Sequence, residues 1–337
     1  MTLRTRTLRA QKILGAAALV AMLTTATAHA AGTIPTTPEP GTLKMGIEPW
    51  LGYGQWYIAQ KDGIFAKRGL SQVQIVNFTE DKDINAALAS GQLDAANIAT
   101  HTAMGMIAAG LPVKAIMLLD FSLSADAIIA TGDVKTIADL KGKQVAFEQG
   151  TTSDILLNYA LSQNGMTIAD VVPVPMPAAD AGSALLAGRV PVAVTYEPYI
   201  AAAKKQDPKV SLVYTAGKDP GLVSDVLVVT DDAIKNKPGQ VLALVKSWGD
   251  ALTAYDADKI AGRKIIAEGV GASPEELASA FDGVRYYSLL ESKTSFNGDF
   301  RTRTFADVLT AAKKAGLVTK DVTAAEMLDP DFLTAAN

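Results

Sequence analysis

Residues 185–197 read LLAGRVPVAVTYE, and residues 88–100 read LASGQLDAANIAT. Both stretches follow the order of a helix end, a glycine, a short apolar run typical of a strand, and a polar loop. When Gly91 and Gly188 are aligned, Thr100 lies opposite Glu197. The repetition predicts two similar lobes, each with a loop at the carboxyl end of a strand. The alternative is that both stretches are the helix-to-strand turn common to all α/β folds.

Short apolar runs alternate with helical segments over most of the chain. The predicted strands are Leu43–Ile47, Val73–Phe78, Ala95–Ile98, Val113–Leu119, Ala127–Ala130, Gln144–Phe147, Val171–Val174, Val190–Val194, Leu212–Tyr214 and Val226–Val229. The predicted helices are Gln55–Arg68, Lys82–Ser90, Thr102–Ala109, Ser153–Asn164, Ala178–Ala187, Ile200–Lys205, Pro238–Tyr255, Pro274–Ala280 and one near Thr304–Ala315. This order predicts an α/β fold whose mostly parallel sheets are covered by helices on both faces.

The N-terminus has the features of a secretory signal peptide. Four basic residues precede and flank an apolar run over residues 13–23, and small residues then lead to Ala28-His29-Ala30. We expect cleavage after Ala30, followed by an extended, proline-containing leader over residues 31–42. The apolar run is short for a membrane span, and the chain has no cysteine to carry a lipid. We therefore expect an exported, soluble protein of the bacterial periplasm that is not lipid-anchored.

The composition excludes several classes of partner and site. The chain has 31 basic and 35 acidic residues, and loss of four basic residues with residues 1–30 changes the formal net charge from −4 to −8. An acidic surface argues against nucleic acid and anionic membranes as partners. Without cysteine, and with His101 as the remaining histidine, Cys- and His-based metal centres are excluded. We expect no metal, no cofactor and no catalytic residues.

Four stretches carry a family pattern: WLGYGQWYIAQKDGIFAKRGL at 50–70, AALASGQLDA at 86–95, IADLKGKQVAFEQGTTSD at 137–154, and GRVPVAVTYEPY at 188–199. With these stretches the chain resembles the sulfonate/nitrate/taurine branch of ABC-transporter substrate-binding proteins, a branch that also contains thiamine-precursor binders. The resemblance spans roughly residues 43 to 230. The C-terminal third is consistent with it but carries little signature.

The resemblance implies a type II periplasmic-binding-protein fold, with two lobes of mixed, mostly parallel sheets joined by a two-strand hinge. Lobe 1 would comprise residues 43–131 and 222–330, and lobe 2 residues 132–221. Ala127–Ala130 and Val226–Val229 would then be neighbouring strands at the crossing. A monomer would close around a small-molecule solute and deliver it to the membrane permease of an ABC importer. The alternatives are an enzyme of precursor-synthase or dehydratase type on the same fold, and a solute-sensing module for a receptor.

Candidate ligand-binding residues occur in three predicted loops. Trp50, Gly52 and Tyr53 follow the first strand, where glycine lets the backbone approach a ligand and the aromatic rings supply walls. Thr100 and His101 form the repeated loop of the first lobe. Gly150, Thr151 and Thr152 precede a helix whose N–H groups and dipole suit an anion. The alternative is ordinary helix capping, with Ser153 or Thr152 as the N-cap and Asp154 in the first turn.

Acidic residues also lie near predicted strand ends. They are Asp126, Glu197 and Asp225, with Glu48 beside the first loop, and these loops contain no lysine or arginine. Asp126 and Asp225 have an alternative interpretation as structural hydrogen-bonding groups at the lobe crossing. We hypothesise a small organic anion or zwitterion, taurine-like in outline, with the anionic end at Gly150 and an ammonium or amidinium group at Glu197.

Overall fold

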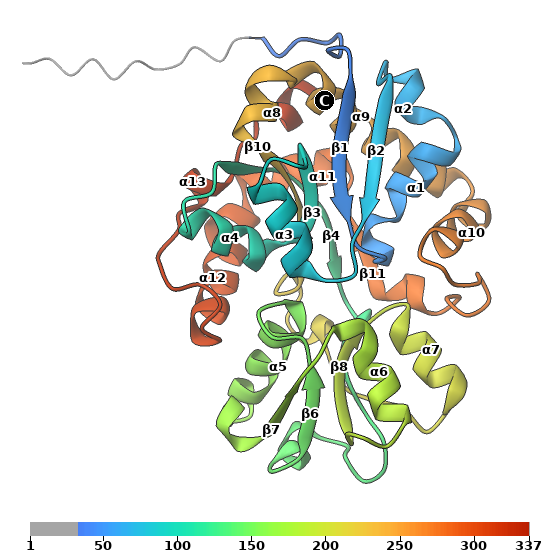
Figure 1. Cartoon of the computed structure of the whole chain (residues 1–337), viewed down its shortest axis with the longest axis vertical. Coiled ribbons are helices and arrows are strands. Elements are labelled where there is room, and N and C mark those ends of the chain that lie inside the picture. Colours follow the sequence, from blue (N-terminus) through green and yellow to red (C-terminus); the bar gives the residue numbers. More distant parts are fainter. Residues whose placement is uncertain (1–32, 337) are drawn as a thin grey trace, which may run out of the picture. The chain divides into compact units, whose positions relative to one another are not determined.

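Two mixed β-sheets form the framework of the computed structural model, which describes residues 33–336 (Figure 1). The predicted signal peptide, residues 1–30, lies outside the described residues. From Ile34 onward the chain forms one compact unit.

The first sheet has six strands in the order β11-β4-β10-β3-β1-β2. Their bounds are Val284–Tyr286, Val113–Ser122, Ser224–Thr230, Ala95–Ala99, Thr42–Ile47 and Gln72–Asn77. Strand β1 runs parallel to β2 and β3, while β10 runs antiparallel to β3 and β4. Apolar residues dominate the buried positions of all the central strands, as expected for a sheet covered on both faces.

The second sheet has five strands in the order β7-β6-β8-β5-β9, with bounds Val172–Pro175, Gln144–Phe147, Val192–Tyr196, Asp126–Ala130 and Ser211–Thr215. Alternate residues of its strands enter two separate cores. Ile128, Val145 and Val194 pack with α5 (Thr152–Gln163), and Ile129 and Ala193 pack with α6 (Ala178–Leu186) and α7 (Tyr199–Gln206). Both faces of this sheet are therefore covered by helices.

The remaining helices pack with the first sheet around one large core. They are α1 (Gly54–Lys61), α2 (Ile64–Lys67), α3 (Asp81–Ala89), α4 (Thr100–Ala108), α8 (Asp231–Asn236), α9 (Pro238–Ala257), α10 (Lys259–Gly269), α11 (Leu289–Asn297), α12 (Phe305–Lys314), α13 (Ala324–Met327) and α14 (Asp331–Ala336). The predicted helix Gln55–Arg68 is broken into α1 and α2 because Gly63 takes the left-handed conformation, with φ of 66°. Pro274–Ala280 does not form the predicted helix; the structure has turns there, followed by a 3₁₀ turn at Ala280–Gly283.

The predicted neighbours at the lobe crossing are wrong. Strand Asp126–Ala130 pairs with β8 and β9, and Ser224–Thr230 pairs with β3 and β4, so the two strands belong to different sheets. The chain therefore enters the second sheet before Asp126, earlier than the predicted boundary at residue 131. Two connecting segments are the real neighbours: Ser122 N–H donates to Val223 O, and Gly217 N–H donates to Leu123 O. Apart from this boundary, the division into a first lobe of residues 43–131 and 222–330 and a second lobe of residues 132–221 remains a prediction.

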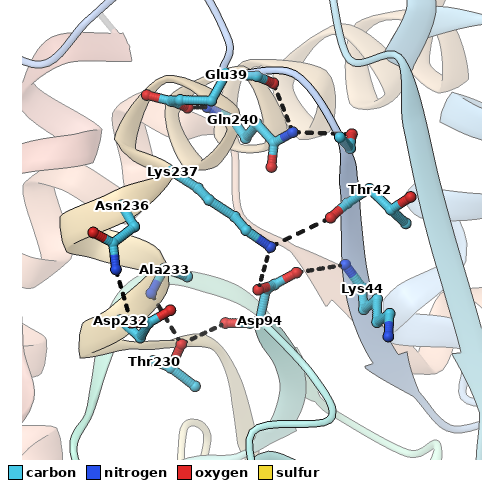
Figure 2. A network of polar contacts seen from close by, with 11 residues as sticks. Glu39, Thr42, Lys44, Asp94, Thr230, Asp232, Ala233, Asn236, Lys237 and Gln240 are labelled. Carbon is cyan, nitrogen blue, oxygen red and sulfur yellow. Dashed lines mark hydrogen bonds and ion pairs between the residues drawn. The ribbon is translucent and has the colours of Figure 1, made fainter.

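The amino ends of β1 and β3 are held by a polar network that includes the predicted leader (Figure 2). Asp94 accepts from Lys237 Nζ at 2.7 Å and from Lys44 N at 2.9 Å. The Glu39 carboxylate accepts from Gly239 N and Gln240 N, which are orphan donors in the first turn of α9. The leader is thus fastened to α9 immediately before β1 begins.

Candidate functional site

A cavity of about 40 Å³ lies at the carboxyl ends of the parallel strands of both sheets. Glu48 and Ala99 lie at the ends of β1 and β3 in the first sheet, and Glu148 and Tyr196 at the ends of β6 and β8 in the second. In open α/β sheets, ligands bind beyond these carboxyl ends, because loops there diverge and leave a crevice. The cavity therefore occupies the place where such a fold holds a ligand.

Three kinds of polar or aromatic side chain line the cavity, with a few small apolar ones. The carboxylates are Glu48, Asp126, Glu148 and Asp225; the hydroxyls are Thr151, Thr152 and Ser153; the aromatic residues are Trp50, Tyr53 and Tyr196; the apolar residues are Ala99, Ala178 and Val223. Of the predicted site residues, the structure brings Trp50, Tyr53, Asp126, Thr151, Thr152 and Asp225 together here. It does not bring Gly52, Thr100, His101, Gly150 or Glu197 to the lining.

The wall from the first lobe is built on a buried hydrogen bond. Trp50 Nε1 donates to Asp120 Oδ1 at 3.0 Å, and this bond fixes the indole ring beside the cavity. Gly52 is needed for the same contact, because a Cβ there would lie 2.0 Å from Trp50 Nε1 and 2.3 Å from Asp120 Oδ1. Gly52 was predicted to let a ligand approach the backbone; the space it leaves is filled by Trp50 and Asp120.

Asp120 forms a cluster of acidic groups with Asp126 and Asp225 behind and beside the cavity. Burial, together with the charge of Asp126, raises the pKa of Asp120 to about 7, although hydrogen bonds from Trp50 and with Asp225 oppose the rise. A hydrogen bond between two carboxyl groups requires a proton between them. Asp120 and Asp225 therefore share a proton at this edge of the sheet.

The amino end of α5 forms part of the wall from the second lobe, and its N–H groups are partly engaged within the chain. Gly150 N donates to Asp154 Oδ2 at 2.9 Å, and Ser153 N donates to the capping hydroxyl Thr151 Oγ1 at 3.3 Å. The loop caps the helix and Asp154 lies in its first turn, as the alternative predicted, but the capping residue is Thr151 and not Ser153 or Thr152. Asp154 thus engages the Gly150 N–H, the donor predicted for the anionic end of a solute, while Thr151, Thr152 and Ser153 line the cavity.

Glu148 and Tyr196 complete this wall. Glu148 Oε2 accepts from Ala178 N at 3.0 Å and so holds the start of α6. The ring of Tyr196 meets that of Trp50 edge to face, with centroids 5.9 Å apart and an interplanar angle of 80°. This aromatic contact joins residues of the two sheets directly beside the cavity.

The structure directs Glu197 away from the cavity. Its carboxylate Oε2 accepts from Ala201 N at 2.9 Å in the first turn of α7, which follows the cis peptide bond to Pro198. Burial raises the pKa of Glu197 to about 7, and the hydrogen bond from Ala201 opposes that rise. The two-ended site built on Gly150 and Glu197 is therefore not what the structure assembles, because both residues satisfy local helix termini.

Thr100 and His101 are buried behind the cavity at the start of α4. The hydroxyls of Thr100 and Ser224 lie 2.9 Å apart and share a hydrogen bond. Burial lowers the pKa of His101 to about 4, while a hydrogen bond to the backbone of Thr151 acts in the opposite direction. His101 thus links the first lobe to the α5 loop of the second.

Several lining residues were missed in the list of candidates, most clearly Glu148, Ser153 and Tyr196. Glu148 follows a predicted strand at its carboxyl end, as Glu48 does, so the same strand-end rule identifies both. Asp120 carries no such signal, because it lies within β4 and becomes relevant only through its bond to Trp50.

Two further searches of residues 33–336 were negative. No cluster of three or more His, Cys, Asp or Glu side chains in this range has an arrangement that could hold a metal ion. Within the same range, no helix combines the length and the apolar character needed to cross a bilayer.

Sequence comparisons identify relatives of this chain. Residues 52–256 match the family described as NMT1/THI5 like. A putative binding protein of Brucella abortus (strain 2308) is 34% identical over 163 residues, which are 48% of this chain and 50% of the relative. A putative aliphatic sulfonates-binding protein of Escherichia coli K12 is 29% identical over 171 residues, covering 50% and 53%. The taurine-binding periplasmic protein of the same strain is 25% identical over 201 residues, covering 60% and 63%. The chain thus spans about half the length of the curated relatives it matches.

Solved structures share the fold at low sequence identity. The alkanesulfonate-binding protein SsuA of Xanthomonas axonopodis pv. citri bound to MOPS has a TM-score of 0.70 at 20% identity, covering 86% of this chain and 98% of that one. The periplasmic nitrate-binding protein NrtA of Synechocystis PCC 6803 has a TM-score of 0.74 at 18% identity, covering 89% of each chain. The desulfurization enzyme DSZB has a TM-score of 0.61 at 15% identity, covering 88% of this chain and 99% of that one. The predicted fold class, that of the periplasmic binding proteins, is confirmed.

Proposed function

The chain belongs to the NMT1/THI5-like family, and from this premise we propose that it is the solute-binding component of an ABC importer. It captures a small solute in the cavity at the strand ends and delivers it to a membrane permease. Export to the periplasm as an unanchored monomer belongs to the same proposal. The observation that carries it is the convergence of polar and aromatic side chains from both sheets on one cavity, at the carboxyl ends of the parallel strands.

The size of the cavity supports binding by closure. A space of about 40 Å³ holds only a few water molecules, on the measure in which about 10–15 Å³ holds one. A solute with several heavy atoms therefore needs the walls to separate and to close again around it. The segments around Leu123 and Gly217 are the place for such a hinge, because they connect the two sheets and hydrogen-bond to each other.

A binding role is favoured over catalysis. The curated relatives named above are binding proteins, although DSZB is an enzyme with the same fold. The described residues that line the cavity include no histidine, cysteine or lysine, which are the usual nucleophiles and bases besides carboxylates. Ser153 lies at the lining, but its neighbours there are hydroxyls and carboxylates with no imidazole to activate it. A sensory module would use the same cavity and differ only in its protein partner.

A thermal-shift screen of the purified protein tests the proposal. The screen uses taurine, ethanesulfonate, nitrate, ethanolamine, choline and putrescine as probes. A solute that binds only the folded state stabilises it by about 2.7 kcal/mol at a hundredfold excess over Kd, which raises the unfolding midpoint.

An Ala99→Phe variant, which fills the cavity without altering its charges, should lose the shift. Ala257→Phe, at an exposed position at the end of α9, is the control. A shift that survives in Ala99→Phe would move the binding site elsewhere. Catalytic turnover of a bound probe would replace the proposal with the enzyme alternative.

A further inference from the structure

Helix α7, which follows the cavity residue Tyr196 in the second lobe, has two packing faces. Ile200 and Ala203 enter a core of the second sheet, so one face of the helix is held to its own lobe. Ala201 packs instead against the core of the first sheet, as Tyr196 does. Lys205 lies four residues after Ala201, one turn further along the same face of the helix. Helix α7 therefore belongs to one lobe and contacts the other.

The far end of this face forms an ion pair between the lobes. Lys205 Nζ donates a hydrogen bond to the carboxylate of Glu276, which lies in a turn of the first lobe after α10. Leu277, the next residue, is fully buried in the core of the first sheet and fixes the turn to that lobe. The ion pair therefore joins an element that is fixed in one lobe to an element that is fixed in the other.

Glu276 is held in place by its own turn. Its Oε2 accepts from Ser273 N at 2.9 Å, and its backbone N–H donates to Ser273 Oγ at 3.3 Å, the reciprocal arrangement of a capping box. Its other oxygen, Oε1, accepts from Lys205. The hydrogen bonds from Lys205 and from Ser273 lower the pKa of Glu276 to about 2, so the carboxylate is charged at neutral pH.

The opposite end of α7 is tied to the cavity. The ring of Tyr196 meets that of Trp50 in the first lobe with centroids 5.9 Å apart, and it meets Tyr199 in the first turn of α7 at 5.2 Å. Glu197 Oε2 accepts from Ala201 N and so fixes the start of the helix. A movement of α7 relative to the first lobe would therefore alter the aromatic wall of the cavity and the ion pair together.

We propose that α7 is a latch, in which the ion pair between Lys205 and Glu276 holds the two lobes closed over the solute cavity. The inference rests on the proposed function and adds how closure of that site is controlled. Neither residue is among those that line the cavity, so the pair acts on closure without touching the solute.

The expected size of the effect follows from the surroundings of the pair. The side chain of Lys205 is 66% exposed and that of Glu276 is 29% exposed, and exposed ion pairs contribute little to the stability of a fold. The equilibrium between closed and open lobes is more sensitive, because a contact made only in the closed form acts in full on the ratio of the two forms. Salt screens exposed charges, so the latch weakens as the ionic strength rises.

Electron–electron double resonance between two spin labels on the purified protein tests the latch. The chain has no cysteine, so Lys209→Cys in the second lobe and Lys264→Cys in α10 provide specific attachment at exposed positions. With Lys205 and Glu276 intact we expect a short and a long distance between the labels. Lys205→Met should lower the ratio of short to long by about threefold to tenfold, because the ion pair is lost. Lys205→Arg, which keeps the charge, should retain the ratio.

Glu276→Gln separates the latch from the turn, because the amide oxygen can still accept from Ser273 N. It should lower the ratio as Lys205→Met does, and the double variant should be no lower than either single variant, because both changes remove one contact. Sodium chloride at about 0.5 M should lower the ratio in the wild type but not in the double variant. Lys204→Met, at the exposed neighbouring position of α7, is the control and should leave the ratio unchanged.

Circular dichroism verifies that each variant is folded. A ratio that is unchanged in Lys205→Met and Glu276→Gln, or effects of the two that add, would overturn the inference. A wild type that shows the long distance alone would also overturn it. These results would leave the proposed function standing, because the labelled protein is measured without solute. The expected ratios together with no thermal shift for any probe would support the latch and count against the proposed function.

Discussion

The two edges of the first sheet treat carboxylates in opposite ways. At the amino ends of β1 and β3, Asp94 is neutralised by Lys237 and accepts the backbone N–H of Lys44 (Figure 2). At the carboxyl ends of the same strands, Asp120 and Asp225 contact each other beside Glu48 and Asp126, and the described residues that line the cavity include no basic side chain. The same type of side chain therefore has a stabilising partner at one edge and a like-charged neighbour at the other.

This difference separates a carboxylate that is neutralised by a basic side chain from one that is brought close to neutral by protonation. A buried charge is normally paired within the chain, because desolvation otherwise costs several kcal/mol. At Asp120, burial and the charge of Asp126 favour the protonated form instead, with a pKa of about 7.

Gly52→Ala should give the largest effect, because it disrupts the cavity edge itself. The added Cβ would lie 2.0 Å from Trp50 Nε1 and would break a buried hydrogen bond to a carboxylate. We expect the free energy of unfolding to fall by about 4 kcal/mol, from overpacking together with the lost charged hydrogen bond. Urea denaturation measures it. Gly105→Ala in α4 is the control, because its nearest atom, Leu317 O, lies 3.8 Å away. Equal stabilities for the two variants would show that the Trp50–Asp120 contact is dispensable.

Asp94→Asn and Asp225→Asn compare the two edges directly in the protein without solute. Asp94→Asn removes the partner of a partly buried Lys237 and should lower the free energy of unfolding by about 2–3 kcal/mol. Asp225→Asn keeps a hydrogen-bonding side chain of the same size beside Asp120 and should change the free energy of unfolding by less than about 1 kcal/mol, in either direction. Thermal and urea denaturation measure both, with Asp83→Asn at an exposed position of α3 as the control. A larger loss for Asp225→Asn than for Asp94→Asn would reverse the comparison.

Asp120→Asn should change how stability depends on pH. Burial holds the pKa of Asp120 at about 7 in the folded protein, above the value near 3.9 of an unfolded chain. Stability from this group is therefore fully present below about pH 4 and is lost as the pH rises through about 7. Between pH 5 and pH 8 the wild type should lose about 2 kcal/mol more of its free energy of unfolding than the variant loses, as measured by urea denaturation at each pH.

The comparison with the wild type removes the contributions of two other buried groups. Burial raises the pKa of Glu197 to about 7, so this group, like Asp120, lowers the free energy of unfolding as the pH rises. Burial lowers the pKa of His101 to about 4, so this group lowers the free energy of unfolding as the pH falls. Both groups are present in the two proteins. Parallel stability profiles across this range would show that Asp120 does not titrate there.

Most of the secondary structure could be predicted from the sequence. Each of the ten predicted strands is present, with ends within three residues of the predicted ones. The repeated pattern also extends to the structure, because α3 and β3 begin at Asp81 and Ala95, and α6 and β8 begin 97 residues later, at Ala178 and Val192. Local periodicity and glycine helix stops carry this information.

The direction of individual side chains could not be predicted in the same way. Glu197 and Gly150 lie at strand ends as expected, but a local helix terminus engages each of them. Gly52 faces Asp120, which is 68 positions away in the sequence. Strand β11 was not predicted, because its three residues are too few to show the alternation of apolar and polar residues that marks a strand. The lobe crossing was misplaced, because the partner of a strand depends on tertiary contacts. Periodicity identifies an element, whereas the partner of one side chain depends on residues far away in the sequence.

The order of strands in the first sheet has a consequence for how the chain folds. Its central strand β10 pairs with β3 and β4, yet the whole second sheet, from Asp126 to Thr215, lies between them in the sequence. The second lobe comes from one continuous segment and can fold as soon as that segment has been synthesised. The first lobe must wait for residues 224–230 and closes a long loop, which makes its pairing slow. Until then the apolar edges of β3 and β4 remain open, so the N-terminal half of the lobe is the part of the incompletely folded chain most in need of a chaperone.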